Sequence, residues 1–84
     1  MKEIRLTHQN SSTHIAFSLP EKSNVELFLH NVRGSRSIRL AKMVMQKGLR
    51  QLQITGNGLQ AGVYIYVLKA NQQQMDFGRI VISN

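Results

Sequence analysis

Apolar and polar residues alternate along most of this chain, with a repeat of about two rather than the repeat of about 3.6 that marks a helix. The alternation is cleanest in residues 13–19 and 25–30, whose apolar positions are Ile15, Phe17, Leu19, Val25, Leu27 and Leu29. Pro20 closes the first segment, and the polar residues after it form a turn. Both segments are therefore predicted to be strands with one buried face.

The segment 59–70 differs because it is apolar on both alternating sides. One side carries Val63, Ile65 and Val67, and the other carries Tyr64, Tyr66 and Leu68. Its β-branched and aromatic residues favour a strand over a helix, and the glycines at its start indicate a turn into it. A strand that is apolar on both sides is normally central and covered on both faces, so we expect the other strands to cover this one.

Alternating apolar residues also occupy 36–45, 49–55 and 75–83. Met43 and Met45 are out of phase with the other apolar residues of their segment, which predicts a bulge near Lys42. Gly78 marks a second expected bulge in the last segment, which follows a predicted hairpin loop over 71–74.

Six to seven short strands about ten residues apart, with turn residues between them and no helical pattern, predict an all-β fold. The expected architecture is an immunoglobulin-like antiparallel β-sandwich over residues 13–84. Residues 1–12 form either a linker or a short edge strand, in which Ile4 and Leu6 alternate. A tight turn is expected at 31–34, where Gly34 is free to adopt positive φ, and a loop is expected at 56–58.

Size and charge narrow the functional classes. The 84 residues make one small domain without room for a deep catalytic cleft, and the absence of cysteine excludes disulfides and thiolate metal sites. Eleven Lys and Arg against four Asp and Glu give a formal net charge of +7, which favours acidic partners such as nucleic acid, anionic lipid or polyanionic glycan. The plainer interpretation is a solvated surface, which we favour because the basic residues are spread along the chain.

A basic set lies around one turn and its neighbouring strands: Arg33, Arg36, Arg39, Lys42, Lys47 and Arg50. Proteins that bind nucleic acid on a sheet usually interleave such residues with exposed aromatic side chains. The aromatic residues here are Phe17, Phe28, Tyr64, Tyr66 and Phe77, and most of them fall at expected core positions. We therefore expect solvated strand faces and no nucleic-acid partner. Tyr64 and Tyr66 are expected in the core, with their hydroxyl groups reaching polar partners at the rim.

No chemistry-bearing residues form a catalytic pattern. The acids Glu3, Glu21, Glu26 and Asp76 are scattered one at a time, and His8, His14 and His30 lie on different segments. The serines lack a nucleophile turn, and the glycines of 56–58 lead into a strand rather than into the helix that a phosphate loop requires. We expect no enzyme activity, no metal and no cofactor.

An ordered set of motifs gives a more specific hypothesis. Residues 15–20 read Ile-Ala-Phe-Ser-Leu-Pro, 25–34 read Val-Glu-Leu-Phe-Leu-His-Asn-Val-Arg-Gly, 59–68 read Leu-Gln-Ala-Gly-Val-Tyr-Ile-Tyr-Val-Leu, and 78–82 read Gly-Arg-Ile-Val-Ile. In this order they resemble the motifs I-x-F-x-L-P, V-x-L-x-I-Y-D-x-x-G, L-x-x-G-V-Y-x-Y-x-L and the terminal K-x-x-V of the C-terminal sorting domains of the type IX (Por) secretion system of Bacteroidota. Gly48 matches the glycine of that family's A-G-x-H turn.

The resemblance covers residues 13–84 and has departures. Asn10, Ser11 and Ser12 stand where the family has its P-N-P-F lead-in. His30 and Asn31 replace Tyr and Asp, and Arg79 replaces the usual lysine.

The resemblance implies a non-catalytic sorting signal that is covalently part of a larger cargo protein. Such a cargo crosses the periplasm and is then secreted or attached to the outer-membrane cell surface. The implied partners are the outer-membrane translocon and an attachment complex with a sortase-like peptidase. We expect recognition to involve Gly62, Tyr64, Arg79, Ile80, Val81 and Ile82, with sheet-edge pairing by the terminal strand as one mode.

Two other functions stay open. An immunoglobulin-like accessory domain that spaces or stiffens a larger secreted enzyme would have the same fold. The basic set would also suit a nucleic-acid or glycan binder. Exposed edge strands further allow a weak dimer.

Overall fold

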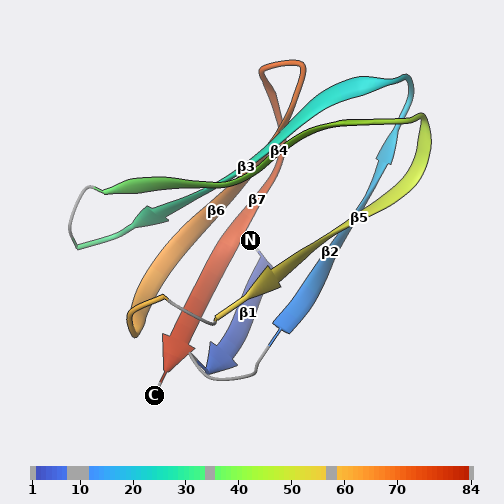
Figure 1. Cartoon of the computed structure of the whole chain (residues 1–84). Helices are drawn as coiled ribbons and strands as arrows, with labels where there is room; N and C mark the ends of the chain where they lie inside the picture. Colours follow the sequence, from blue (N-terminus) through green and yellow to red (C-terminus); the bar gives the residue numbers. More distant parts are fainter. Residues whose placement is uncertain (1, 8–11, 34–35, 57–58, 84) are drawn as a thin grey trace.

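The computed structural model describes residues 2–7, 12–33, 36–56 and 59–83. The strands that run through these residues (Figure 1) are β1 (Lys2–Thr7), β2 (Ser12–Leu19), β3 (Ser23–Asn31), β4 (Ser37–Met45), β5 (Gly48–Thr55), β6 (Gly62–Ala70) and β7 (Gln73–Ser83). In these ranges there is no helix with the length and apolar character needed to cross a membrane. The predicted all-β fold is confirmed, and each segment predicted to be a strand contains one.

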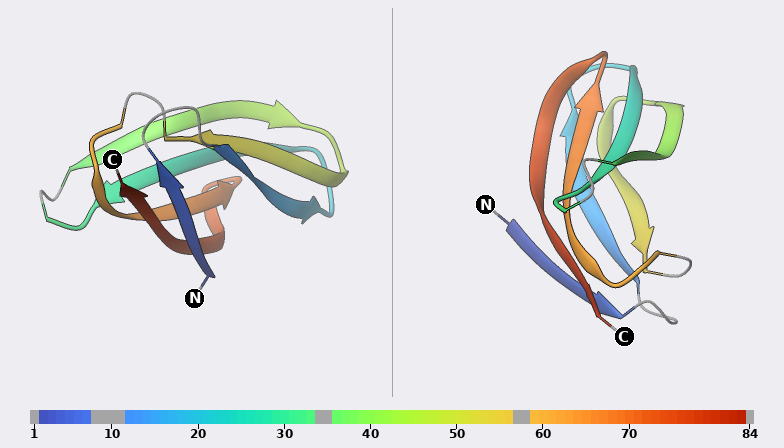
Figure 2. Two further views of the ribbon diagram at one scale, coloured as in Figure 1. Left: turned by 90° about the horizontal axis from the view of Figure 1, so that it is seen from below. Right: turned by 90° about the vertical axis from the view of Figure 1, so that its left-hand side faces the viewer.

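The strands form two sheets. Five of them pair in the order β1-β7-β6-β3-β4, and β2 pairs with β5 in a second sheet. β1 runs parallel to β7, and the other pairs are antiparallel. Figure 2 shows the two sheets as separate layers, with the core between them. The β-sandwich is confirmed, and its narrower immunoglobulin-like assignment stays a prediction.

One long hairpin supplies four of the strands. β2 leads into β3 and β4 leads into β5, while β2 pairs with β5 and β3 pairs with β4. The first ladder stops at the pair Leu19–Gly48, and the second starts at Ser23–Met45. The hairpin therefore folds over at 20–22 and 46–47, and Figure 1 shows this corner at the upper right.

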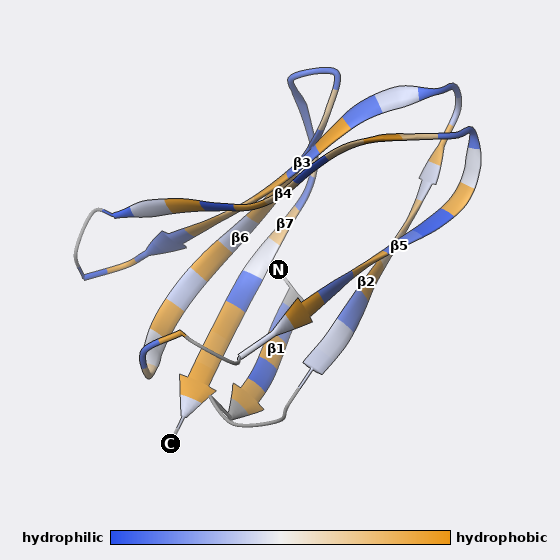
Figure 3. Cartoon of the chain, viewed as in Figure 1, coloured by the Kyte–Doolittle hydropathy of each residue, from blue (hydrophilic) through white to orange (hydrophobic). Residues whose placement is uncertain are grey.

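The core forms where the inner sides of the two sheets meet. Its members come from the alternating positions seen in the sequence (Figure 3) and are Ile4, Leu6, Ile15, Phe17, Leu19, Val25, Leu27, Leu29, Leu52, Ile54, Tyr64, Tyr66, Leu68, Ile80 and Ile82. Burying one such aliphatic or aromatic side chain stabilises a fold by about 1.5–3 kcal/mol. This cluster is therefore the main source of stability in the domain.

β6 lies in the middle of its sheet, but only one of its faces is covered. Tyr64, Tyr66 and Leu68 are buried beneath the second sheet. Val63 and Val67, on the opposite side, are half-buried, and no described strand covers them. The expectation that both faces of this strand are covered is wrong, because the second sheet lies on one side only.

The ladder between β3 and β4 contains the expected irregularity at a different residue. Ala41 and Arg39 pair with successive residues of β3, so Leu40 is the extra residue rather than one near Lys42. The bulge shifts the phase of the strand, which explains why the apolar residues of β4 do not keep one alternation.

The bulge expected at Gly78 is also displaced. Gly78 pairs with Tyr66 in a regular ladder, whereas the partners of Leu68 and Lys69 are Asp76 and Gln74. Met75 is thus the extra residue of β7.

β1 is an edge strand rather than a linker. It pairs with β7, and its Ile4 and Leu6 side chains are buried in the core. The structural unit therefore includes β1, upstream of the expected boundary at residue 13. The turn expected at 31–34 and the loop expected at 56–58 lie partly outside the described residues.

The turn between β6 and β7 is shorter than the loop expected over 71–74. Asn71 and Gln72 have φ angles of 51° and 69°, and β7 begins at the next residue. Asn71 also holds the start of β3: its amide donates to the Asn24 carbonyl at 2.8 Å, and its Oδ1 accepts from the Asn24 amide at 3.0 Å. Asparagine tolerates this left-handed backbone, whereas glutamine does so poorly.

This turn leads to a first prediction. Gln72→Gly should raise the free energy of unfolding by about 0.5–1 kcal/mol, because glycine carries no steric penalty at positive φ. Urea unfolding measures the change. Gln73→Gly is the matched control, since it places the same residue in the following strand and should destabilise by about 0.5–1 kcal/mol. Equal destabilisation by both variants would contradict the strain at Gln72.

Candidate functional site

The residues marked for recognition divide between the surface and the interior. Arg79 and Val81 lie on the side of β7 that faces away from the second sheet, and the Arg79 side chain is 47% exposed. Gly62 is half-buried at the start of β6, with a φ of 158°. A Cβ at this position would meet Tyr64 Cε1 at 3.9 Å, which is ordinary contact.

Tyr64, Ile80 and Ile82 belong to the core. These residues are only 3%, 0% and 2% exposed, so they offer very little surface to a docking partner. Their expected part in recognition stays a prediction. Because they are buried, they would act indirectly, by holding in place the strands that carry Arg79 and Val81.

The terminal strand is not available for sheet-edge pairing. β7 is paired on one side with β6 and on the other with β1. Over residues 78–82 both of its backbone edges are occupied, so the expected pairing of a partner with this terminal stretch is wrong for the folded domain. The sheet instead ends at β1 and at β4.

The five-stranded sheet has an apolar outer side. Phe28 pairs with Val67, which in turn pairs with Phe77, so these side chains form one row across the sheet. We call this side the outer face; its residues are Glu3, Arg5, Glu26, Phe28, His30, Arg39, Lys42, Val63, Ile65, Val67, Lys69, Phe77, Arg79 and Val81. Within the described chain no strand covers it, and Phe77 is 43% exposed.

The outer face changes the interpretation of the aromatic residues. Phe17, Tyr64 and Tyr66 are in the core as expected, whereas Phe28 and Phe77 stand on the outer face beside basic side chains. Phe28 and Phe77 lie on the outer face because each alternates with the buried residues of its strand.

Basic side chains dominate the charge of the outer face, and its acids are paired. Glu3 lies 3.2 Å from Arg5 and 3.4 Å from Arg79, and Glu26 lies 3.5 Å from Arg39. The two pairs of Glu3 are exposed and contribute about 0–1 kcal/mol each, whereas the Glu26 side chain is only 19% exposed. An acidic group of a partner can therefore replace Glu3 at little cost.

Both core tyrosines use their hydroxyl groups at the rim, as predicted. The Tyr64 hydroxyl donates to the Gln60 carbonyl oxygen at 2.7 Å, and the Tyr66 hydroxyl donates to Asp76 Oδ2 at 3.2 Å. Burial, together with the charge of Asp76 and its hydrogen bond, raises the pKa of Tyr66 to about 12. The Tyr66 hydroxyl therefore stays protonated at neutral pH.

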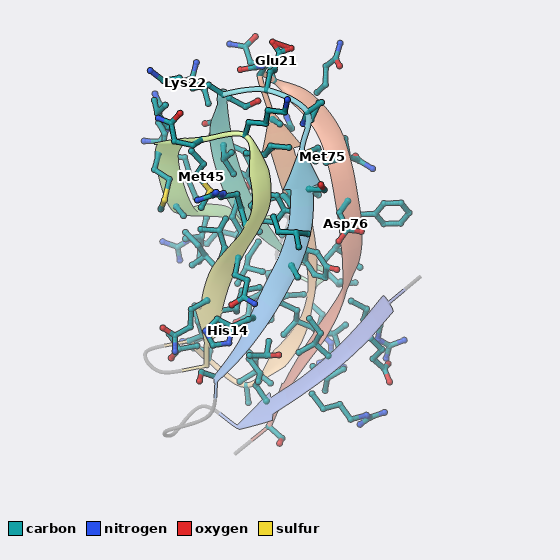
Figure 4. All side chains as sticks on the ribbon, turned by 90° about the vertical axis from the view of Figure 1, so that its right-hand side faces the viewer. His14, Glu21, Lys22, Met45, Met75 and Asp76 are labelled. Atoms are coloured by element: carbon teal, nitrogen blue, oxygen red, sulfur yellow. The ribbon has the colours of Figure 1, made fainter. Side chains whose placement is uncertain are left out.

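The other chemistry-bearing residues stay apart. His14 lies on β2 at the far end of the molecule from Glu21 and Lys22 (Figure 4). Among the described residues, no group of three or more His, Cys, Asp or Glu side chains could hold a metal ion. A surface depression of about 400 Å³ is lined by Asn24, Glu26, Lys42, Asn71 and Gln72.

Comparisons with known proteins bear on the fold alone. No protein-family model matches the sequence, and no curated protein matches it. Among solved structures, the chain is similar to an uncharacterized protein from Bacillus anthracis str. Ames, with a TM-score of 0.71 and 13% identity over 96% of this chain and 77% of that one. At this identity the likeness supports the β-sandwich and carries no function.

The Tyr66 hydrogen bond leads to a second prediction. Tyr66→Phe should lower the free energy of unfolding by about 1 kcal/mol at neutral pH, because Asp76 loses its donor. The unfolded phenol titrates near pH 10 and the folded one near pH 12, so wild type should lose about 1.4 kcal/mol per pH unit between these values.

Urea unfolding from pH 8 to 12 measures this loss, and Tyr66→Phe should lack this component of it. Equal pH slopes for wild type and variant would show that Tyr66 ionises as easily in the folded state as in the unfolded chain.

Proposed function

We propose that this chain is a sorting domain for type IX secretion, which directs a covalently attached cargo across the outer membrane and to the cell surface. The support is the ordered resemblance of 15–20, 25–34, 59–68 and 78–82 to the motifs of that family. In this proposal the domain catalyses nothing and acts through its folded surface.

The observation that carries the mechanism is the accessible position of Arg79. It stands on the outer face, across from Ile65 and beside the half-buried Val81. An apolar patch with an arginine at its margin is typical of a protein-docking surface, in which aromatic and arginine side chains contribute most of the binding energy. We assign the outer face as the docking surface for the translocon.

The ion pair of Arg79 with Glu3 fits this role. The arginine Nε lies 3.4 Å from Glu3 Oε1, and both side chains are well exposed. The pair holds the guanidinium against the sheet without burying it, so the guanidinium is oriented before a partner arrives.

The third prediction tests the function directly. Residues 1–84 fused to a periplasmic reporter should bring the reporter to the medium or cell surface of a host that has type IX secretion. Arg79→Ala should lower export severalfold while leaving the melting temperature nearly unchanged, because an exposed ion pair contributes little to stability. Fractionation and immunoblotting measure export.

Two variants control this experiment. Arg33→Ala makes the same chemical change at an exposed residue at the tip of the hairpin, so export should match wild type. Glu3→Ala breaks the ion pair but keeps the arginine, which separates the pair from the side chain. An intact wild-type fusion that stays in the periplasm would leave the sorting function without support. Full export of the Arg79→Ala fusion would show that the Arg79 side chain is not needed for recognition.

A further inference from the structure

β4 has an open backbone edge. It is the last strand of its sheet, and β3 is the only described strand that pairs with it. β5 continues the same side of the bent hairpin and pairs only with β2 in the part of the chain described. Figures 1 and 2 show β4 at the margin of the molecule. Amide and carbonyl groups along this edge are ready to pair with another strand.

The inner side of β4 is apolar and incompletely covered. Ile38 and Met43 pair with core residues of β3 and are therefore on the inner side, yet they are 37% and 42% exposed. The second sheet ends at β5 and leaves this flank open. A depression of about 250 Å³ lies there, lined in part by Ile38, Leu59 and Tyr64. An added strand would bury apolar surface on this side.

The outer side of the same strand is basic. Arg39 pairs with Phe28 and Lys42 pairs with Glu26, so both lie on the outer face. Arg50 of β5 adds a cation on the inner side, because it pairs with the buried Phe17. Its Nη2 donates to the Lys47 carbonyl oxygen at 3.2 Å, while its Nε is buried and has no hydrogen-bond partner in the described structure.

We propose that the β4 edge binds an extended segment of another protein in which acidic and apolar residues alternate. Main-chain hydrogen bonds to β4 supply affinity, as in other cases of strand addition. Acidic side chains of the segment pair with Arg39 and Lys42, and the apolar side chains between them cover Ile38 and Met43. The site shares Arg39 and Lys42 with the outer face but does not include Arg79, and it does not depend on the sorting function.

The charges argue against other occupants. If two copies of this chain paired through β4, Arg39 and Lys42 of both copies would gather on one face and repel. A polyanion without apolar residues would leave Ile38 and Met43 exposed. Basic residues on an edge strand commonly protect it from pairing with other chains. That role does not explain why the apolar side chains of Ile38 and Met43 are exposed on the inner side of the same strand.

The test uses three synthetic peptides of ten residues with blocked ends. One alternates Glu and Val, a second alternates Lys and Val, and a third has five Glu followed by five Val. Fluorescence anisotropy measures binding to the 84-residue chain, and amide chemical shifts locate it. The alternating acidic peptide should bind, with shifts concentrated in β4, and the other two should bind at least about tenfold more weakly.

Variants sharpen the assignment. Arg39→Glu combined with Lys42→Glu should weaken the acidic peptide about tenfold and strengthen the basic one. Arg33→Glu combined with Lys22→Glu makes the same change in net charge at exposed residues beyond the two ends of the β4 ladder and should leave binding within about twofold. Melting curves confirm that each variant is folded.

The proposal would be overturned if the alternating acidic peptide did not bind, if the block peptide bound equally well, or if heparin displaced the alternating peptide. It would also be overturned if the amide chemical-shift changes centred on β1 or on the outer face of β6 and β7. Equal binding of the block peptide would mean a general polyanion site. Sedimentation that shows a dimer lost on reversing Arg39 and Lys42 would mean that a second copy occupies the edge.

Discussion

The fold depends on one long hairpin that bends so that its apolar side closes on itself. Ile15 and Leu19 lie before the corner and Val25 and Leu29 after it, all with the same parity and all buried. A straight hairpin with this pattern would expose a continuous apolar face to water. Bending brings the two halves into layers, and the remaining strands extend the larger layer. The size difference between the sheets follows, because β6, β7 and β1 all add to the β3 side.

Alternation was sufficient to predict the strands and nearly all of the core, because the side chains of a strand with one buried face must alternate. Alternation did not predict correctly how β6 is covered, because both faces of this strand are apolar. The sequence of β6 does not indicate whether Val63, Ile65 and Val67 are covered, since that depends on which other strands share their layer. The positions of the two bulges were predicted wrongly for a related reason. A change of phase in the apolar pattern shows that a strand has an extra residue, but the pairing with a neighbouring strand decides which residue it is.

The candidate site was predictable only in part. Arg79 follows from motif resemblance and from its alternation with the buried Ile80, but the same motif also marks Tyr64 and Ile82, whose burial the pattern of their strands already indicated. The open edge of β4 could not be predicted, because sequence does not reveal which strand ends a sheet. The positions of Phe28 and Phe77 outside the core were visible in their phase, yet their aromatic character favoured a core assignment.

The parallel pairing of β1 with β7 has a mechanical consequence. Lys2 stands across from Gly78, and Thr7 stands across from Ser83, so the two strands enter and leave their shared ladder in the same direction. Tension applied between the start of β1 and the end of β7 therefore slides one strand along the other. In this shear geometry the bonds of the ladder are loaded together, whereas peeling would break them one at a time. The ladder between β1 and β7 is therefore loaded in shear when the domain is pulled along this line.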